Sequence, residues 1–176
     1  MCIRDRFSTN DLNHPGIKSL IKRGKYFISG KISRPQYKNF TFQKFEVTPK
    51  KSKELIYIKG WNTVVGFHTR NIPHQGHIFI QKKSIKYANA DGLMLSPAVG
   101  VKKKGDFKNE MLIESYSEVL RSKTHYNKAI LCCLDIYSRY AGAREAVFTA
   151  ICRKNLGCSH FIVGRDHAGP GLKANM

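Results

Sequence analysis

Apolar residues gather in blocks along the chain from residue 61 onward, and the blocks alternate between two lengths. Short runs rich in β-branched and apolar residues predict buried strands, because they are too short to be helices. These runs are residues 61–67, 92–96, 129–136 and 160–164. Longer segments between them space their apolar residues as amphipathic helices do; they are residues 74–88, 109–121 and 144–155. Strands that alternate with helices predict an α/β fold with a parallel sheet, whose ligands bind at the carboxyl ends of the strands.

Residues 13–60 follow a different pattern. Two stretches, residues 26–32 (YFISGKI) and 40–47 (FTFQKFEV), suggest short strands, with Pro and Gly between them. A lysine-rich segment, residues 48–60, then leads to the first strand of the α/β region. We interpret these features as the end of a separate β-rich domain that runs into a linker.

The charge of the chain points to an anionic ligand. The 176 residues include 31 Lys and Arg against 12 Asp and Glu, and the resulting net charge of +19 is spread along the chain. Such a field attracts phosphate, nucleotides, sulfate or nucleic acid. An ordinary lysine-rich solvated surface would give the same excess, so charge alone does not choose a function.

The cysteines and the apolar runs indicate the compartment. The five cysteines form no C-x-x-C pair and fit neither a zinc site nor a disulfide framework. We therefore expect a reducing, cytoplasmic setting. The N-terminus has no apolar signal core, and the longest clean apolar run, AILCCL, is too short to cross a bilayer.

An unusual concentration of polar groups, HTRNIPHQGH at residues 68–77, directly follows the first predicted strand. His74 and His77 are three residues apart, so they share one face of a helix. Pro73 suits the first helical turn, which would place both imidazoles where the free N–H groups and the helix dipole already favour an anion. The spacing therefore predicts an anion site at this helix start.

The neighbouring residues fit transfer of a phosphoryl group. Arg70 can grip a tetrahedral oxyanion with two donors, and Asn71 adds an amide. No Ser or Cys in the cluster is paired with a base, so a covalent mechanism is not indicated. H-x-x-H also occurs in metal sites, but H-E-x-x-H is absent and no third ligand is suitably spaced, so we expect no protein-bound metal.

A second cluster, GRDHAGPG at residues 164–171, follows the last predicted strand. It again combines a cation, a carboxylate and an imidazole. Its glycines, Gly164, Gly169 and Gly171, allow close backbone approach to a ligand. Because both clusters begin where a predicted strand ends, we expect them to form one site.

These two motifs resemble those of the ATP sulfurylase (sulfate adenylyltransferase) family. The family's Q-x-R-N-P-x-H-x-x-H motif reads HTRNIPHQGH here, and its G-R-D-H-A-G motif is unaltered. The joining segment RYAGAREAVFTAICRKNLGCSHFIV is similar to the family throughout. Upstream, HPGIKSLI and FEVTPKKSKELIYIKGW resemble the junction between the family's PUA-like domain and its catalytic domain. The resemblance covers roughly residues 13–172.

Carried over position by position, the resemblance implies three groups of site residues. The catalytic group is Thr69, Arg70, Asn71, His74 and His77. The ATP-binding group is His68, Thr69, Arg70, Asn71, Gly164, Arg165, Asp166 and His167. The sulfate-binding group is His68, Arg70 and Ala168. The two catalytic histidines would stabilise the transition state at the α-phosphate, and Ala168 would contact sulfate through its backbone N–H.

The implied reaction joins sulfate to the α-phosphate of ATP by direct in-line attack and releases pyrophosphate. Mg²⁺ would accompany ATP and help to neutralise its phosphates. The partners expected from the family are ATP and sulfate, a homo-oligomer, and a possible downstream kinase domain for the product, adenylyl sulfate (APS). No membrane and no nucleic acid are expected.

The resemblance also defines the expected architecture. It implies a Rossmann-like sheet of the H-x-x-H nucleotidyltransferase type, preceded by a small β-rich remnant of a PUA-like domain. On this interpretation residues 1–12 are unassigned and residues 13–58 end the PUA-like domain. Residues 59–176 then form a catalytic domain that is incomplete at its C-terminus.

Three positions depart from the family's pattern. His68 stands where the motif begins with Gln, Pro73 lies one place later than the usual Pro, and Ser96 stands where many members have His. We interpret these changes as marks of a subfamily. Two other functions stay open from the residues alone: another H-x-x-H nucleotidyltransferase, or a basic RNA-binding module without catalysis.

Overall fold

A computed structural model describes residues 3–26, 28–31, 33, 45, 47–102, 105–122, 124–125 and 127–169. The chain divides into two compact units. The larger unit is Gln43–Tyr137 with Phe148–Val163, and the smaller is Met1–Phe42 with Ser138–Val147 and Gly164–Met176.

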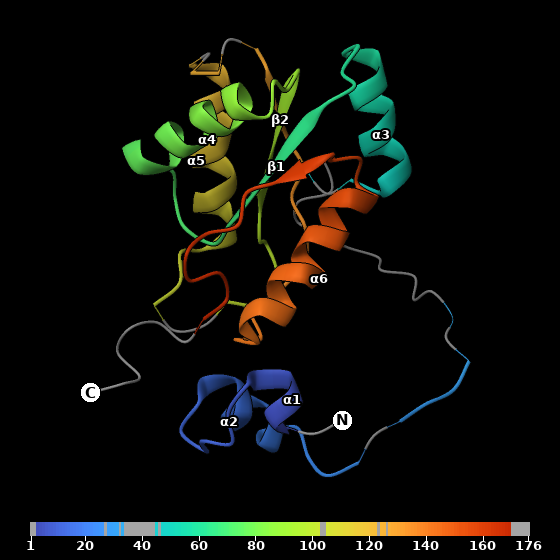
Figure 1. The fold of residues 1–176 in the computed structure, drawn as a ribbon, viewed down its shortest axis with the longest axis vertical. Helices are drawn as coiled ribbons and strands as arrows, with labels where there is room; N and C mark the ends of the chain where they lie inside the picture. Colours follow the sequence, from blue (N-terminus) through green and yellow to red (C-terminus); the bar gives the residue numbers. More distant parts are fainter. Residues whose placement is uncertain are drawn as a thin grey trace. The chain divides into compact units, whose positions relative to one another are not determined.

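The larger unit is built on a parallel four-stranded sheet (Figure 1). Its strands are β1 (Val64–Thr69), β2 (Gly92–Pro97), β3 (Ala129–Leu131) and β4 (His160–Phe161). They lie in the order β3-β2-β1-β4, and every neighbouring pair is parallel. The predicted α/β fold with a parallel sheet is confirmed.

All four strands differ in their bounds from the sequence prediction, β2 by one residue only, and hydrogen bonding explains where β1 begins. β1 begins at Val64 because the N–H groups of Asn62 and Thr63 both donate to the Asp91 carboxylate, each at 2.8 Å, and not to a neighbouring strand. β3 ends at Leu131, although the N–H groups of Cys132 and Leu134 still donate to the β2 carbonyls of Leu95 and Pro97.

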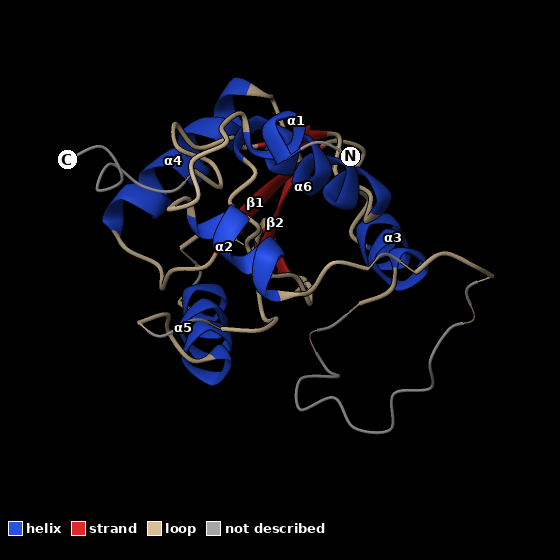
Figure 2. Ribbon diagram, turned by 90° about the horizontal axis from the view of Figure 1, so that it is seen from below, coloured by secondary structure: helices blue, strands red, loops and turns tan. Residues whose placement is uncertain are grey.

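Helices cover both faces of this sheet (Figures 1 and 2). α4 (Gln75–Tyr87) and α5 (Asn109–Arg121) lie on one face. α3 (Pro49–Ile58) and the second half of α6 (Gly142–Asn155) lie on the other. The three helices predicted from residues 74 to 155 are therefore present, with ends shifted by at most two residues.

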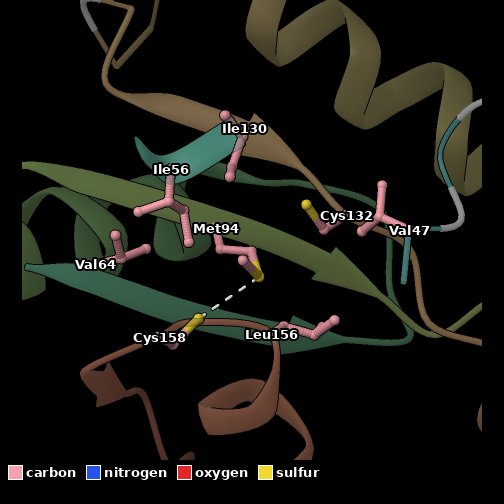
Figure 3. Packing of buried hydrophobic residues seen from close by; sticks show 8 residues of the cluster. All are labelled: Val47, Ile56, Val64, Met94, Ile130, Cys132, Leu156 and Cys158. Atoms are coloured by element: carbon pink, nitrogen blue, oxygen red, sulfur yellow. Dashed lines mark hydrogen bonds between the residues drawn. The ribbon is translucent and has the colours of Figure 1, made fainter. Parts of the chain in front are cut away.

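A hydrophobic core ties α3 and the segment that follows α6 to the sheet (Figure 3). It consists of Val47, Ile56, Val64, Met94, Ile130, Cys132, Leu156 and Cys158. Ile56 comes from α3, so the segment that we interpreted as a linker is a helix packed in the core of the α/β unit. Thr48 caps this helix and Pro49 occupies its first turn; its lysine-rich exposed face conceals the apolar pattern in the sequence.

The smaller unit is helical in its described N-terminal part. α1 (Ile3–Phe7) and α2 (Pro15–Lys22) pack where Gly16 approaches the Phe7 ring and the Arg139 carbonyl, so closely that a Cβ at Gly16 would lie 2.5 Å from each. The strand predicted at residues 26–32 does not form among its described residues, and most of residues 40–47 lie outside the described ranges. A PUA-like remnant is therefore not confirmed.

Candidate active site

The order of the strands identifies where a ligand should bind in the larger unit. The chain passes from β1 outward to β2 and β3, then returns to the other side of β1 as β4. In open parallel sheets, ligands bind outside the carboxyl ends of the strands at such a reversal. The first motif begins at the end of β1, and the second begins three residues after β4. Strands β1 and β4 are the neighbours between which the chain reverses its direction across the sheet, and each motif follows one of them.

His74 and His77 form a stacked pair at the start of α4. Their ring centroids are 3.8 Å apart with an interplanar angle of 28°, and the His77 ring meets the edge of Phe67 on β1 at 5.1 Å. The shared face predicted from their spacing is confirmed. Pro73, which we expected within the first turn, precedes it, because His74 is the N-cap and α4 begins at Gln75.

The capping contact determines which nitrogen of His74 can donate. Its Nδ1 accepts the Gly76 N–H at 3.1 Å, so the hydrogen of the neutral ring sits on Nε2. Gly76 is required by this geometry, since a Cβ there would lie 3.0 Å from the His74 ring. His74 can thus donate to an anion through Nε2–H even when it is uncharged.

The second histidine of the pair favours the neutral form. Burial lowers the pKa of His77, the charge of His74 lowers it further, and a contact with the Ile72 carbonyl opposes both. Two cationic rings stacked this closely would repel. The two imidazoles are therefore better suited to donate hydrogen bonds from neutral rings than to carry a positive charge on both rings.

The loop between β1 and α4 is held from beneath by Thr69 and Tyr116. The Thr69 hydroxyl accepts the Asn71 N–H at 3.0 Å. Tyr116 on α5 is fully buried, and its hydroxyl donates to the Asn71 carbonyl at 3.2 Å. Burial raises the pKa of Tyr116, so this hydroxyl remains a donor. The sequence suggested Tyr116 only as a core residue.

Arg70 has a second cation near it that the sequence prediction missed. Lys102, on the loop after β2, donates from Nζ to the Ala98 carbonyl at 2.7 Å. Burial lowers the pKa of Lys102, Asp106 opposes that shift, and the positive charge of Arg70 adds to it. A run of three lysines, residues 102–104, gave no reason to choose one. Two cations that repel each other at a strand end suit an anionic ligand.

His68, at the far end of β1, lies on the opposite face of the sheet from Thr69. Its Nδ1 contacts Arg153 of α6 and lies 3.3 Å from the Ser96 carbonyl. His68 and Ser96 are register partners on adjacent strands. Two of the three departures from the family's motifs are therefore neighbours in space.

The second motif forms a compact turn in the smaller unit. The N–H of His167 donates to the Gly164 carbonyl at 3.2 Å, and the N–H of Gly169 donates to the Asp166 carbonyl at 3.3 Å. Ala168 has φ +57°, a left-handed conformation that non-glycine residues seldom adopt. Such local strain is typical of functional loops. That this motif and the first form one site stays a prediction.

Two buried cysteines, Cys132 and Cys158, do not offer a nucleophile. Burial raises the pKa of Cys132 and of Cys158 to about 12, and the Cys158 thiol contacts the Met94 sulfur at 3.5 Å (Figure 3). A buried protonated thiol is inert, because the thiolate is the reactive form.

Among the residues that the structure describes, no group of three His, Cys, Asp or Glu side chains could hold a metal ion. No helix within the described ranges is long and apolar enough to cross a membrane.

These observations define the class: an α/β domain with a parallel sheet and a polar loop after β1, at a strand reversal. A family model described as ATP-sulfurylase matches residues 43–172. The chain belongs to the ATP-sulfurylase family.

Curated relatives agree with this assignment. Over 94% of its length, the chain is 43% identical to a sulfate adenylyltransferase of Pyrococcus abyssi. Over the same share it is 44% identical to one of Halothermothrix orenii. The chain spans 43% of the length of each of these relatives.

One solved structure is similar in fold. It is described as a hexameric APS kinase from Thiobacillus denitrificans, with a TM-score of 0.58 and 23% identity. The likeness covers 75% of this chain and 26% of that one.

Proposed function

We propose that the protein carrying this chain is a sulfate adenylyltransferase, which converts ATP and sulfate to adenylyl sulfate and pyrophosphate. The observation that carries the proposal is the stacked His74–His77 pair at the start of α4, in a chain of the ATP-sulfurylase family. The two alternatives, another H-x-x-H nucleotidyltransferase and an RNA-binding module, account less well for the curated relatives.

In the proposed reaction a sulfate oxygen attacks the α-phosphorus of ATP, and the bond to the β-phosphate oxygen breaks so that pyrophosphate leaves. Arg70 and Lys102 attract the anions, and Arg70 binds sulfate. His74 and His77 donate to the α-phosphoryl oxygens as negative charge develops there. The Nε2–H donor that the cap assigns to His74 supports this role.

The second motif is proposed to bind ATP. Arg165 and His167 offer donors to phosphate, and Gly164 and Asp166 shape the turn. Ala168 is proposed to contact sulfate through its backbone N–H, and its left-handed conformation supports such a special role. Thr69 and Asn71 are proposed to contact the nucleotide, together with His68.

Direct attack is favoured over a covalent enzyme intermediate. The Thr69 hydroxyl is hydrogen-bonded to the backbone of Asn71 and not to a base, and the buried thiols of Cys132 and Cys158 have raised pKa values. A covalent route needs an activated nucleophile. Mg²⁺ prefers oxygen ligands and is commonly held by substrate phosphates, so in this proposal it arrives with ATP and neutralises phosphate charge.

The setting and assembly follow the family expectation and are also proposals. No disulfide joins Cys132, Cys152 or Cys158 in the described chain, which fits the reducing cytoplasm. Exposed apolar side chains on α4 and α6 favour a homo-oligomer; they are Phe79, Ile80, Phe148 and Ile151. A downstream domain acting on adenylyl sulfate is a further proposal.

The test is product formation by the protein expressed from its complete reading frame. With ATP, Mg²⁺ and ³⁵S-sulfate, we expect labelled adenylyl sulfate and one pyrophosphate for each sulfate consumed. Release of pyrophosphate that does not depend on sulfate, or no labelled nucleotide, would contradict the proposal. Phosphate in place of sulfate serves as the control acceptor.

A further inference from the structure

A polar cluster on the α6 side of the sheet joins His68 to two residues, Ser96 and Arg153, that have no role in the chemistry described above. His68 and Ser96 lie side by side on β1 and β2, and the guanidinium of Arg153 reaches both. One of its terminal nitrogens, Nη2, lies 2.5 Å from His68 Nδ1 and 3.3 Å from the Ser96 carbonyl. We call these three residues the Arg153 cluster.

Arg153 is unusual because it is a cation buried between α6 and the sheet. Its side chain is fully buried, and it makes no ion pair with a described carboxylate. Burial lowers the pKa of Arg153 to about 10, so it is still charged near neutral pH. A buried unpaired charge is costly, and a residue that bears this cost needs an explanation.

The cost is not offset by complete hydrogen bonding. Nη1 approaches the Thr149 carbonyl at only 3.5 Å, and Nε has no partner. The hydroxyl of Ser96 is also buried without a partner. Stability alone would favour an apolar side chain in this place, so the position of Arg153 points to function.

The contact with Arg153 decides the tautomer of His68. A guanidinium can only donate, so the 2.5 Å contact requires Nδ1 of His68 to accept and its hydrogen to sit on Nε2. The Ser96 carbonyl, which would require a hydrogen on Nδ1, is farther from that nitrogen at 3.3 Å, and the shorter contact decides. A protonated imidazole would set an N–H and a second positive charge against Arg153. His68 is therefore neutral and carries one donor, at Nε2.

We propose that Arg153 is a positioning residue that keeps His68 neutral with its hydrogen on Nε2, so that this nitrogen donates to the sulfate or α-phosphoryl oxygens of the substrates. In this form the imidazole offers an uncharged N–H, as does the Gln amide that begins the motif in the family that the chain resembles. The proposal rests on the proposed function for its ligand, but the state of the His68 ring is independent of activity.

Other charged or titratable groups that the structure describes beside His68 act in the same direction. Cys158 approaches Gly66 from the α6 side, where a Cβ would lie 3.0 Å from its sulfur, and the raised pKa of Cys158 keeps it uncharged. Along the chain, Arg70 and His74 can add only positive charge. None of these groups stabilises a cationic His68.

The first test reads the ring directly. In ¹⁵N-histidine-labelled protein, long-range ¹H–¹⁵N spectra distinguish an unprotonated nitrogen from a protonated one. We expect His68 to show an unprotonated Nδ1 and a protonated Nε2 from pH 7.5 down to pH 5.5. A hydrogen on Nδ1, or protonation of both nitrogens near pH 6.5, would overturn the proposal without bearing on the proposed function.

The second test asks whether Arg153 acts through His68. Arg153→Met should raise the sulfate KM about tenfold, as for loss of a hydrogen bond from a charged group. It should also introduce a pH dependence between about 6 and 7, where a released imidazole titrates. In a His68→Gln background the same change should raise KM less than threefold and add no pH dependence to that of the His68→Gln protein, because Gln has neither tautomers nor a charge.

Equal effects of Arg153→Met in the two backgrounds would show a purely structural role and overturn the proposal. Lys154→Met is the matched control, since it removes an exposed cation from the same helix. If Arg153→Met does not fold, the spectra of the unaltered protein decide the question. If labelled adenylyl sulfate is not formed but the His68 ring has the expected state, the proposed function fails and the assigned tautomer stands.

Discussion

The loop after β1 and the loop after β4 both carry candidate site residues, but they are held in different ways. The first loop is fixed by side chains: the stacked His74–His77 pair against Phe67, and the Tyr116 hydroxyl on the Asn71 carbonyl. The second, residues 164–169, is fixed by backbone turns and by Ala168 in a left-handed conformation.

This difference suggests that the first loop stabilises the transition state and that the second binds the nucleotide. Groups that stabilise a transition state must be in place beforehand, and packing against a core achieves that. A loop that wraps a nucleotide depends on close backbone approach, for which turns and glycines are suited. We therefore expect the first loop to be sensitive to changes of side chain and the second to changes that disturb its backbone.

The largest effect is expected at the histidine pair. His74→Ala or His77→Ala should lower kcat by roughly 10²–10³, as does loss of one donor to a developing oxyanion. His74→Asn sharpens the test, because Asn also caps helices well while lacking the imidazole; it should lose as much. Steady-state kinetics of adenylyl sulfate formation measure this, with His160→Ala, an exposed histidine on β4, as the control. Unchanged rates for both alanine variants would contradict the assigned role.

A smaller effect is expected from the backbone of the second loop. In Gly169→Ala the new Cβ would lie 1.8 Å from the Asp166 carboxylate, so Asp166 must move. Gly30→Ala, in the same unit but outside the second motif, meets no atom within 4 Å and is the matched control. We expect Gly169→Ala to weaken ATP binding about tenfold, equivalent to roughly 1.4 kcal/mol, with little change in thermal stability. Equilibrium titration with ATP checks this, and equal losses for the two variants would show that the Asp166 contact is irrelevant.

The support beneath the first loop should have a modest effect. Tyr116→Phe removes the part-buried hydrogen bond to Asn71 and leaves the Asn71 carbonyl with one partner fewer. We expect a loss of about 1 kcal/mol in the free energy of unfolding and a severalfold lower kcat. Urea denaturation measures the first quantity. Tyr87→Phe, at a side chain that is 96% exposed, should change neither.

The smallest effect concerns pH. The pKa of His77 is lowered in the folded protein, chiefly by burial, so between that pKa and the ordinary value of about 6.5 the unfolded chain binds more protons. The contribution of His77 to the free energy of unfolding is therefore fully present above pH 6.5, and it is lost as the pH falls below that value. His77→Gln should lose less stability than the unaltered protein between pH 7.5 and pH 5.5, as urea denaturation at both values would show. His125 also has a pKa lowered chiefly by burial. It therefore keeps part of the dependence of the free energy of unfolding on pH in both proteins.

The sequence predicted the α/β pattern and the shared face of the histidine pair well, because both depend on local order. The strands after residue 60 are short apolar runs, and the three-residue spacing of His74 and His77 predicts that their side chains meet. α3 was missed because lysines cover its exposed side and only Ser52 and Ile56 are buried.

Contacts between distant segments could not be read from the sequence. Arg153 and Tyr116 lie in helices whose buried faces were predicted only as core, and their roles arise from partners 85 and 45 residues away. Strand order decides which residues become neighbours, and nothing in the local pattern reveals that His68 and Ser96 are paired in register.

The central claim is that sulfate attacks the α-phosphorus of ATP directly, in a site that supplies donors but no nucleophile. The stereochemical course at that phosphorus tests it most directly. With ATP made chiral at the α-phosphorus by isotopic or sulfur substitution, a single in-line displacement predicts inversion of configuration in adenylyl sulfate. Retention would require two displacements through a covalent enzyme intermediate, and would contradict the account.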